Sequence, residues 1–89
     1  MAVLHGAPQP GIEIVDIHGM TRRQAKAHVE ERIRRATHAV YRIRVIHGYR
    51  GGTELREMVR GELSKNMKVL RVELGLNPGE TDLILRELY

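Results

Sequence analysis

Two copies of a His-Gly corner constrain the fold of this 89-residue chain more than any other feature. Residues 15–19 read VDIHG and residues 45–48 read VIHG, and each copy ends an apolar run rich in β-branched residues. Their separation of roughly 30 residues is the length of one β-α-β unit. If both runs are parallel strands of one sheet, His18 and His47 meet at its carboxyl edge, where open α/β sheets bind ligands beside helix amino ends.

The composition limits the chain to one small domain with an aliphatic core. It contains no Trp or Phe and only three Tyr, so Val, Ile, Leu, Met and Ala must fill the interior. The absence of Cys excludes disulfides and thiolate zinc sites and is typical of a reducing cytosol. No apolar run approaches the ~18 residues of a membrane span, so we expect a cytoplasmic protein with no membrane partner.

The charge balance favours a polyanionic partner. The net charge is +4 and the isoelectric point is about 10.0, which makes DNA or RNA the expected partner and disfavours a protein-interaction domain. The scarcity of aromatic side chains argues against single-strand binding on a stacking platform. No pattern in the sequence selects DNA over RNA or fixes an oligomeric state.

The residue pattern predicts the element order β-α-β-α-β-β. Alternating or β-branched runs predict strands over residues 12–18, 41–47, 69–76 and 82–88, and apolar residues at helical spacing predict helices over 22–39 and 53–66. The expected fold is an α/β (α+β) two-layer sandwich, with a mixed four-stranded sheet and two helices formed by residues 12–89. Residues 1–11, rich in Pro and Gly, are expected to form a flexible leader.

The first predicted helix has clear start and packing signals. Thr21 and Gln24 have the spacing of a capping box, with Thr21 as the N-cap residue. Apolar residues then recur every three or four positions, at Ala25, Val29, Ile33, Ala36 and Val40. This stripe is expected to face the sheet.

The two His-Gly corners are the strongest candidates for chemistry. Glycine lets a ligand approach the backbone, and histidine titrates near neutral pH, so His18 and His47 are candidate general acid and base. Asp16 lies on the same strand face as His18 and could orient its ring or help to hold a cation. The alternative is structural: the histidines bond to backbone at tight turns, and Asp16 accepts backbone N–H groups.

Arginines in the first turns of the predicted helices suggest a site for a bound anion. Arg22 and Arg23 occupy the first turn of the first predicted helix and Arg56 that of the second, where each cation opposes the helix dipole at about 0.3–1 kcal/mol. A phosphate between the helix starts would explain their placement, and Arg50 in the glycine loop could join them. The alternative is that these long side chains extend into water.

Two other kinds of site are weakly indicated. The glycine loop lacks the Lys-Ser/Thr of a Walker A loop, so nucleotide hydrolysis is not expected. Asp16, His18 and His47 are ligand types that suit a divalent metal ion such as zinc or manganese. Two histidines on separate strands are not a ligand motif by spacing, so no metal site is assigned.

The two corners resemble the hallmarks of the Smr (small MutS-related) domain family. Its first motif is Asp-Leu-His-Gly at the end of the first strand, matched by residues 16–19 (DIHG). Its second is a His-Gly or Thr-Gly opening a glycine loop before the second helix, matched by residues 47–52 (HGYRGG). The resemblance covers residues 12–88. The family's second motif is usually His-Gly-x-Gly, whereas Arg50 stands here before Gly51, so this loop is one residue longer.

The resemblance implies a βαβαββ fold like the C-terminal domain of a bacterial translation initiation factor. Family members bind DNA or RNA, and several nick or cleave it as endonucleases. Some stand alone, as expected for this short chain with its own Met1. The rival hypothesis is a non-catalytic module that binds nucleic acid or ribosomes.

The predicted site combines the resemblance with the residue analysis. The predicted catalytic residues are Asp16, His18 and His47, and the predicted phosphate-binding residues are Gly19, Arg22, Arg23, Gly48, Arg50, Gly51, Gly52 and Arg56.

Overall fold

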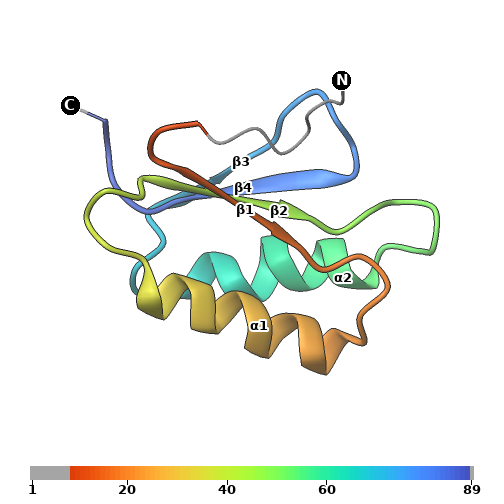
Figure 1. The fold of residues 1–89 in the computed structure, drawn as a ribbon. Helices are drawn as coiled ribbons and strands as arrows, with labels where there is room; N and C mark the ends of the chain where they lie inside the picture. Colours follow the sequence, from red (N-terminus) through yellow and green to blue (C-terminus); the bar gives the residue numbers. More distant parts are fainter. Residues whose placement is uncertain (1–8, 89) are drawn as a thin grey trace, which may run out of the picture.

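Four strands form one mixed sheet with both helices on the same side of it, as the ribbon in Figure 1 shows. The computed structural model describes residues 9–88, so most of the expected leader lies outside the described residues. The strands are β1 (Ile12–Asp16), β2 (Arg42–Ile46), β3 (Arg71–Glu73) and β4 (Glu80–Ile84). Their order in the sheet is β1-β2-β4-β3, with β1 parallel to β2 and the other neighbours antiparallel. This confirms the predicted mixed sheet.

Helix α1 (Arg22–Arg35) begins as the sequence predicts and ends earlier. The capping box is present, because Thr21 Oγ1 accepts from the Gln24 N–H and Gln24 Oε1 accepts from the Thr21 N–H, each at 3.2 Å. Ala36 adopts an extended backbone (ψ 129°), so the predicted extension to residue 39 is wrong. The Ile33 carbonyl accepts from the Ala36 N–H at 3.2 Å and from the Lys68 ammonium at 2.9 Å, in place of the hydrogen bond of a longer helix.

The second predicted helix is one helical stretch with three kinds of turn. It comprises α2 (Glu54–Glu57), a π-helical segment (Met58–Glu62) and a 3-10 segment (Leu63–Lys65). Its core-facing residues include Met58, Val59 and Leu63. They pack with Ala25, Val29 and Ile33 of α1 against the apolar face of the sheet. Among residues 9–88 no helix is long and apolar enough to span a bilayer.

The strands differ from their predicted bounds. Strands β1 and β2 are shorter than the predicted 12–18 and 41–47, and β3 spans fewer residues than the predicted 69–76. Strand β4, predicted over 82–88, begins at Glu80 and ends at Ile84. Glu80 and Thr81, which read as turn residues, belong to β4 because they pair with Ile46 and Val45 of β2. Asp82 inside this strand is 5% exposed, because Arg42 Nη1 donates to it at 2.5 Å and Arg44 Nη2 at 3.0 Å. This ion-pair network occupies the face of the sheet that α1 and α2 leave open.

The described end of the expected leader takes part in the fold. Residues 9–11 form a turn in which the Ile12 N–H donates to the Gln9 carbonyl at 3.0 Å. The Gly11 carbonyl then accepts from the Tyr41 N–H at 2.9 Å, at the entry to β2. Gly11 has φ +82°, and a Cβ there would lie 2.6 Å from the Tyr41 ring, so glycine is required.

Candidate functional site

A pocket of about 550 Å³ lies at the carboxyl edge of β1 and β2. The register pairs Asp16 with Ile46, and the Ile17 N–H donates to the Ile46 carbonyl at 2.9 Å, so both His-Gly corners leave the sheet side by side. A Cβ on Gly48 would lie only 3.7 Å from the His18 Cβ. The lining residues are His18, Gly19, Met20, Ile46, His47, Gly48, Tyr49, Arg50, Gly51, Gly52, Glu54 and Leu55.

His18 is the exposed imidazole of this pocket. Its side chain is 69% exposed, and its Nδ1 lies 2.5 Å from Asp16 Oδ1. The same carboxylate oxygen accepts the backbone N–H of His18 at 3.0 Å, so Asp16 both contacts the ring and accepts a backbone N–H group. Since a carboxylate only accepts, Nδ1 carries the proton and Nε2 is the nitrogen that can accept another.

His47 points to the opposite face of the sheet. Extending the parallel register by one residue places Ile17, not His18, beside His47, and successive side chains of a strand alternate between faces. The His47 ring therefore turns toward the helices and is 5% exposed. The two copies of the motif are similar in sequence but offset by one residue in the sheet.

Both ring nitrogens of His47 have partners. Arg60 Nε donates to Thr81 Oγ1 at 2.9 Å, which leaves the Thr81 hydroxyl proton for His47 Nε2 at 2.8 Å. His47 Nδ1 then donates to the Gly48 carbonyl at 2.7 Å. These hydrogen bonds assign the neutral tautomer of His47 that carries its proton on Nδ1. Burial lowers the pKa of His47 below 6.5, and the charges of Arg60 and Arg56 lower it further.

His47 is among the pocket-lining residues, but its hydrogen bonds do not favour the prediction that it shares the general acid and base roles. A buried ring with both nitrogens bonded has no position from which to exchange a proton with a ligand in this conformation. His47 instead matches the structural alternative, a histidine that bonds to backbone at a tight turn. It orients the Gly48 carbonyl and thereby the start of the glycine loop.

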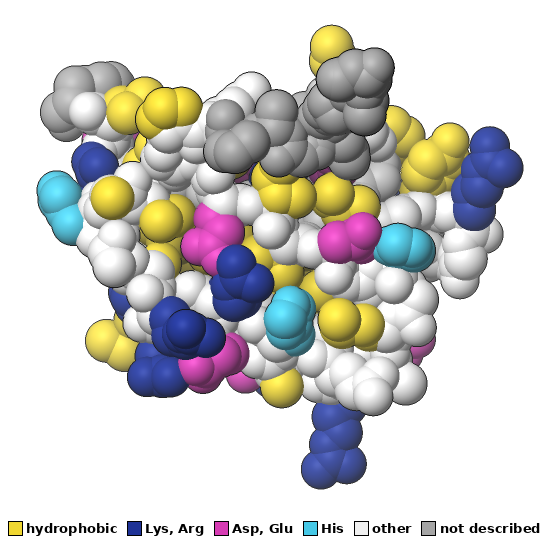
Figure 2. Space-filling model, in the orientation of Figure 1, with side chains coloured by type: hydrophobic (Ala, Val, Ile, Leu, Met, Phe, Trp, Pro, Cys, Tyr) yellow, Lys and Arg dark blue, Asp and Glu magenta, His cyan; other side chains and the backbone are white. Residues whose placement is uncertain are grey.

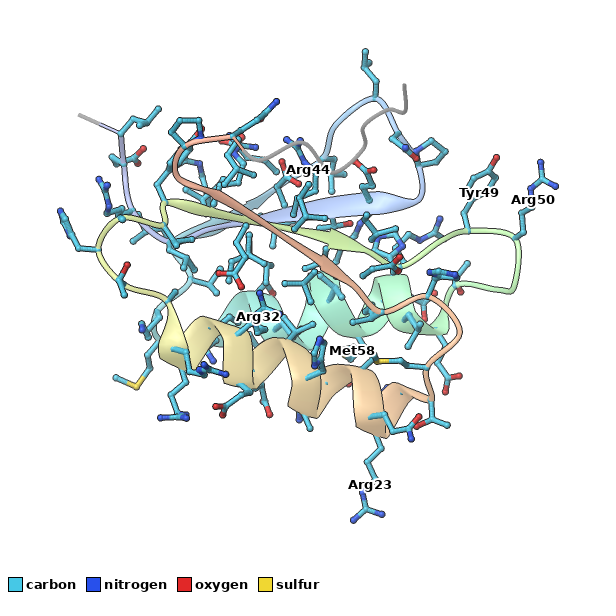
Figure 3. The ribbon with its side chains drawn as sticks, in the orientation of Figure 1. Arg23, Arg32, Arg44, Tyr49, Arg50 and Met58 are labelled. Atoms are coloured by element: carbon cyan, nitrogen blue, oxygen red, sulfur yellow. The ribbon has the colours of Figure 1, made fainter. Side chains whose placement is uncertain are left out.

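The predicted arginines separate into two groups. Arg50 lines the pocket, and Arg56 lies close enough for its charge to act on His47. Arg22 forms an ion pair with Glu62, and Arg23 projects away from the sheet in Figure 3. The structure therefore does not bring Arg22 and Arg23 to the pocket, because Glu62 on the neighbouring helical segment holds the first and solvent surrounds the second.

The pocket is less cationic than the sequence suggests. Arg50 is the one arginine in its lining, and Glu54 contributes a carboxylate. On the face shown in Figure 2, basic side chains are interspersed with acidic ones and form no continuous patch. Any anion in this pocket would thus meet a few positioned groups instead of a broad positive field.

The possible metal set of Asp16, His18 and His47 does not form. Among residues 9–88 no three His, Asp or Glu side chains are placed to hold an ion. His47 is unsuitable in particular, since its Nε2 and Nδ1 are both hydrogen-bonded inside the fold. The residues present offer at most a pair of ligands, Asp16 and His18.

Three residues of the site were missed from the sequence. Thr81 lies 34 residues after His47, and Arg60 lies on the helical stretch that follows the glycine loop; no local signal connects either of them to His47. Tyr49 lies inside the second motif, yet its exposed ring at the pocket follows only from the loop's conformation.

The comparisons with known proteins identify the family. The sequence pattern described as the Smr domain matches residues 15–79. The fold is similar to the crystal structure of the Smr domain of Thermus thermophilus MutS2, with a TM-score of 0.73 and 26% sequence identity over 84% of this chain and 99% of that chain. No curated protein gives a significant match. The chain belongs to the Smr domain family, whose members generally bind nucleic acid and in some cases nick it.

Proposed function

We propose that this Smr domain binds DNA or RNA in the cytoplasm and cleaves a phosphodiester bond at the His18 pocket. The observation that carries the proposal is the contact of 2.5 Å between His18 Nδ1 and Asp16 Oδ1 beside the glycine loop. A carboxylate that fixes the tautomer and orientation of an exposed imidazole prepares the other ring nitrogen as a general base. Such a base accelerates the reaction by about 10²–10⁴-fold.

The reaction requires one nucleophile and one leaving oxygen. His18 Nε2 removes the proton of a ribose 2′-hydroxyl on RNA, or of a water molecule on DNA, while that oxygen forms a bond to phosphorus. The bond from phosphorus to the leaving oxygen then breaks, and this oxygen takes a proton from solvent. Asp16 stabilises the imidazolium that forms on His18.

Arg50 and the glycine loop are the proposed phosphate-binding groups. No carboxylate of residues 9–88 forms an ion pair with Arg50, so its guanidinium is available to a phosphate. Gly19, Gly48, Gly51 and Gly52 line the same pocket and let a phosphate approach the backbone closely. Arg56 adds positive potential, and His47 is a positioning residue that fixes Gly48. Arg22 and Arg23 receive no role at this site.

The test is cleavage of matched labelled RNA and DNA by the wild type, His18→Ala, Asp16→Asn and His47→Ala, each with and without EDTA. We expect His18→Ala to lose most of the activity and Asp16→Asn part of it. His38→Ala is the matched control, because His38 is an exposed histidine at the end of the molecule distant from this pocket. Cleavage that is unchanged in His18→Ala would remove the catalytic assignment.

A non-catalytic nucleic-acid or ribosome binding module is the second candidate function. It is favoured by the engaged ring of His47, which leaves the pocket without a second imidazole to protonate the leaving oxygen. This candidate predicts salt-sensitive binding of oligonucleotides with no cleavage under any condition of the same assay.

A further inference from the structure

Tyr49 is the more exposed of the two tyrosines among residues 9–88, and it lies at the pocket. It is 50% exposed, whereas the other described tyrosine, Tyr41, packs its ring against Gly11. Figure 3 shows Tyr49 and Arg50 projecting from the loop after β2, on the side of the molecule away from α1. An aromatic ring left half in water beside a binding pocket is a candidate ligand contact.

The loop holds this ring in a defined place. The Gly79 carbonyl accepts both the His47 N–H at 2.9 Å and the Gly48 N–H at 3.0 Å, which fixes the residue before Tyr49 to the turn that precedes β4. A Cβ on Gly79 would lie 3.4 Å from the Tyr49 Cδ1, so the ring rests against that turn on one side. The Arg50 guanidinium lies over the ring, and the ring remains 50% exposed beside the pocket.

The neighbours of Tyr49 match the parts of a nucleotide. The Arg50 guanidinium lies 6.0 Å from the ring centroid and is a donor for phosphate. Met20 and Leu55, both half-buried, line the pocket with the tyrosine and give it apolar surface for a flat base. Base, sugar and phosphate can therefore lie between Tyr49 and His18 in a pocket of about 550 Å³.

We propose that Tyr49 stacks on an unpaired nucleobase and that this domain selects single-stranded or locally unpaired nucleic acid. The inference rests on the proposed function and defines its substrate class. The faces of bases inside a duplex are covered by their neighbours, so a protein ring can stack only on a base that is unpaired or flipped out. One tyrosine provides a single stacking contact and not an extended platform, which reconciles the proposal with the scarcity of aromatic residues.

The experiment compares binding of three labelled 10-nucleotide probes: a single strand, the same strand as a blunt duplex, and the same backbone with abasic sites. DNA and RNA versions are titrated at one salt concentration with the wild type, Tyr49→Leu and Tyr49→Phe. We expect the wild type to bind the single strand more tightly than the other two probes. Tyr49→Leu weakens single-strand binding by about 5- to 150-fold and no longer distinguishes it from the abasic strand, whereas Tyr49→Phe keeps the preference.

Leu70→Ala is the control for loss of an exposed apolar side chain. Leu70 is 57% exposed and lines a different pocket at the other end of the molecule, so its removal leaves the preference intact. If oligonucleotides bind but Tyr49→Leu keeps the single-strand preference, or the wild type has none, the stacking inference is overturned while the proposed function stands. If no probe binds in a salt-sensitive manner, the proposed function fails and this inference fails with it.

Discussion

Replacing Thr81 with valine tests the hydrogen-bond chain that holds His47. Thr81 is fully buried, and its hydroxyl accepts from Arg60 Nε at 2.9 Å and donates to His47 Nε2 at 2.8 Å. Valine has nearly the same shape but no hydroxyl, so the packing of the core is retained while both hydrogen bonds are lost. The change in unfolding free energy of Thr81→Val therefore measures these two hydrogen bonds and not a change in packing.

The expected loss is about 2 kcal/mol of unfolding free energy. A buried acceptor that loses its partner costs about 1–3 kcal/mol, and here His47 Nε2 is that acceptor. Arg60 is only partly buried and can bond to water instead, so it adds little. For a small domain, about 2 kcal/mol corresponds to a fall in Tm of about 8–16 °C.

Thermal and urea unfolding of the wild type, Thr81→Val and Thr81→Ser measure this effect. Serine keeps the hydroxyl and loses one methyl group. We therefore expect Thr81→Ser to lower the unfolding free energy by about 1 kcal/mol and to keep the hydrogen bonds to Arg60 and His47. Nitrogen chemical shifts of the His47 ring should show protonated Nδ1 in the wild type and in Thr81→Ser. An unfolding free energy of Thr81→Val within about 0.5 kcal/mol of the wild type would show that the Thr81 hydroxyl does not stabilise the fold.

Three further predictions concern pH, ion pairs and salt. Since burial lowers the pKa of His47 below 6.5, the unfolded chain binds a proton that the folded chain does not, so the unfolding free energy should fall on acidification from about pH 7.5 to about pH 5.5. Urea unfolding should show a smaller fall in His47→Gln, and an equal fall would contradict this. Asp82→Asn should lose about 2–4 kcal/mol in urea unfolding, because two arginines of β2 lose their buried partner; a loss near zero would oppose it. Arg50→Ala should reduce the slope of log K against log salt for oligonucleotide binding by about 0.7–0.9, and Arg23→Ala should not; equal slopes would exclude Arg50 from phosphate binding.

Local patterns in the sequence predict much of this fold. Strand β2 alternates Arg42 and Arg44 with the buried Ile43 and Val45, as its period of two indicates. The start of β4 is not predictable in this way, because Glu80 and Thr81 read as part of a turn and join the strand only by pairing with Ile46 and Val45 of β2.

The Asp16–His18 pair could be predicted from the sequence, whereas the burial of His47 could not. Asp16 and His18 are two residues apart, at the end of β1 and in the turn that follows, so a local contact brings them together and the sequence predicts the pair. The burial of His47 depends on Thr81 and on a register offset of one residue between β1 and β2. Register is set by the packing of whole strands, which two similar motifs do not reveal.

The most direct test of the account is where nucleic acid binds. Backbone amide shifts of the protein labelled with nitrogen-15, followed by NMR during titration with a short single-stranded oligonucleotide, give that location. The largest changes should fall in residues 18–20 and 46–55, which form the pocket of His18 and Tyr49. Changes centred instead on residues 36–40, 67–70 and 85–86, around the pocket at the other end of the molecule, would contradict it.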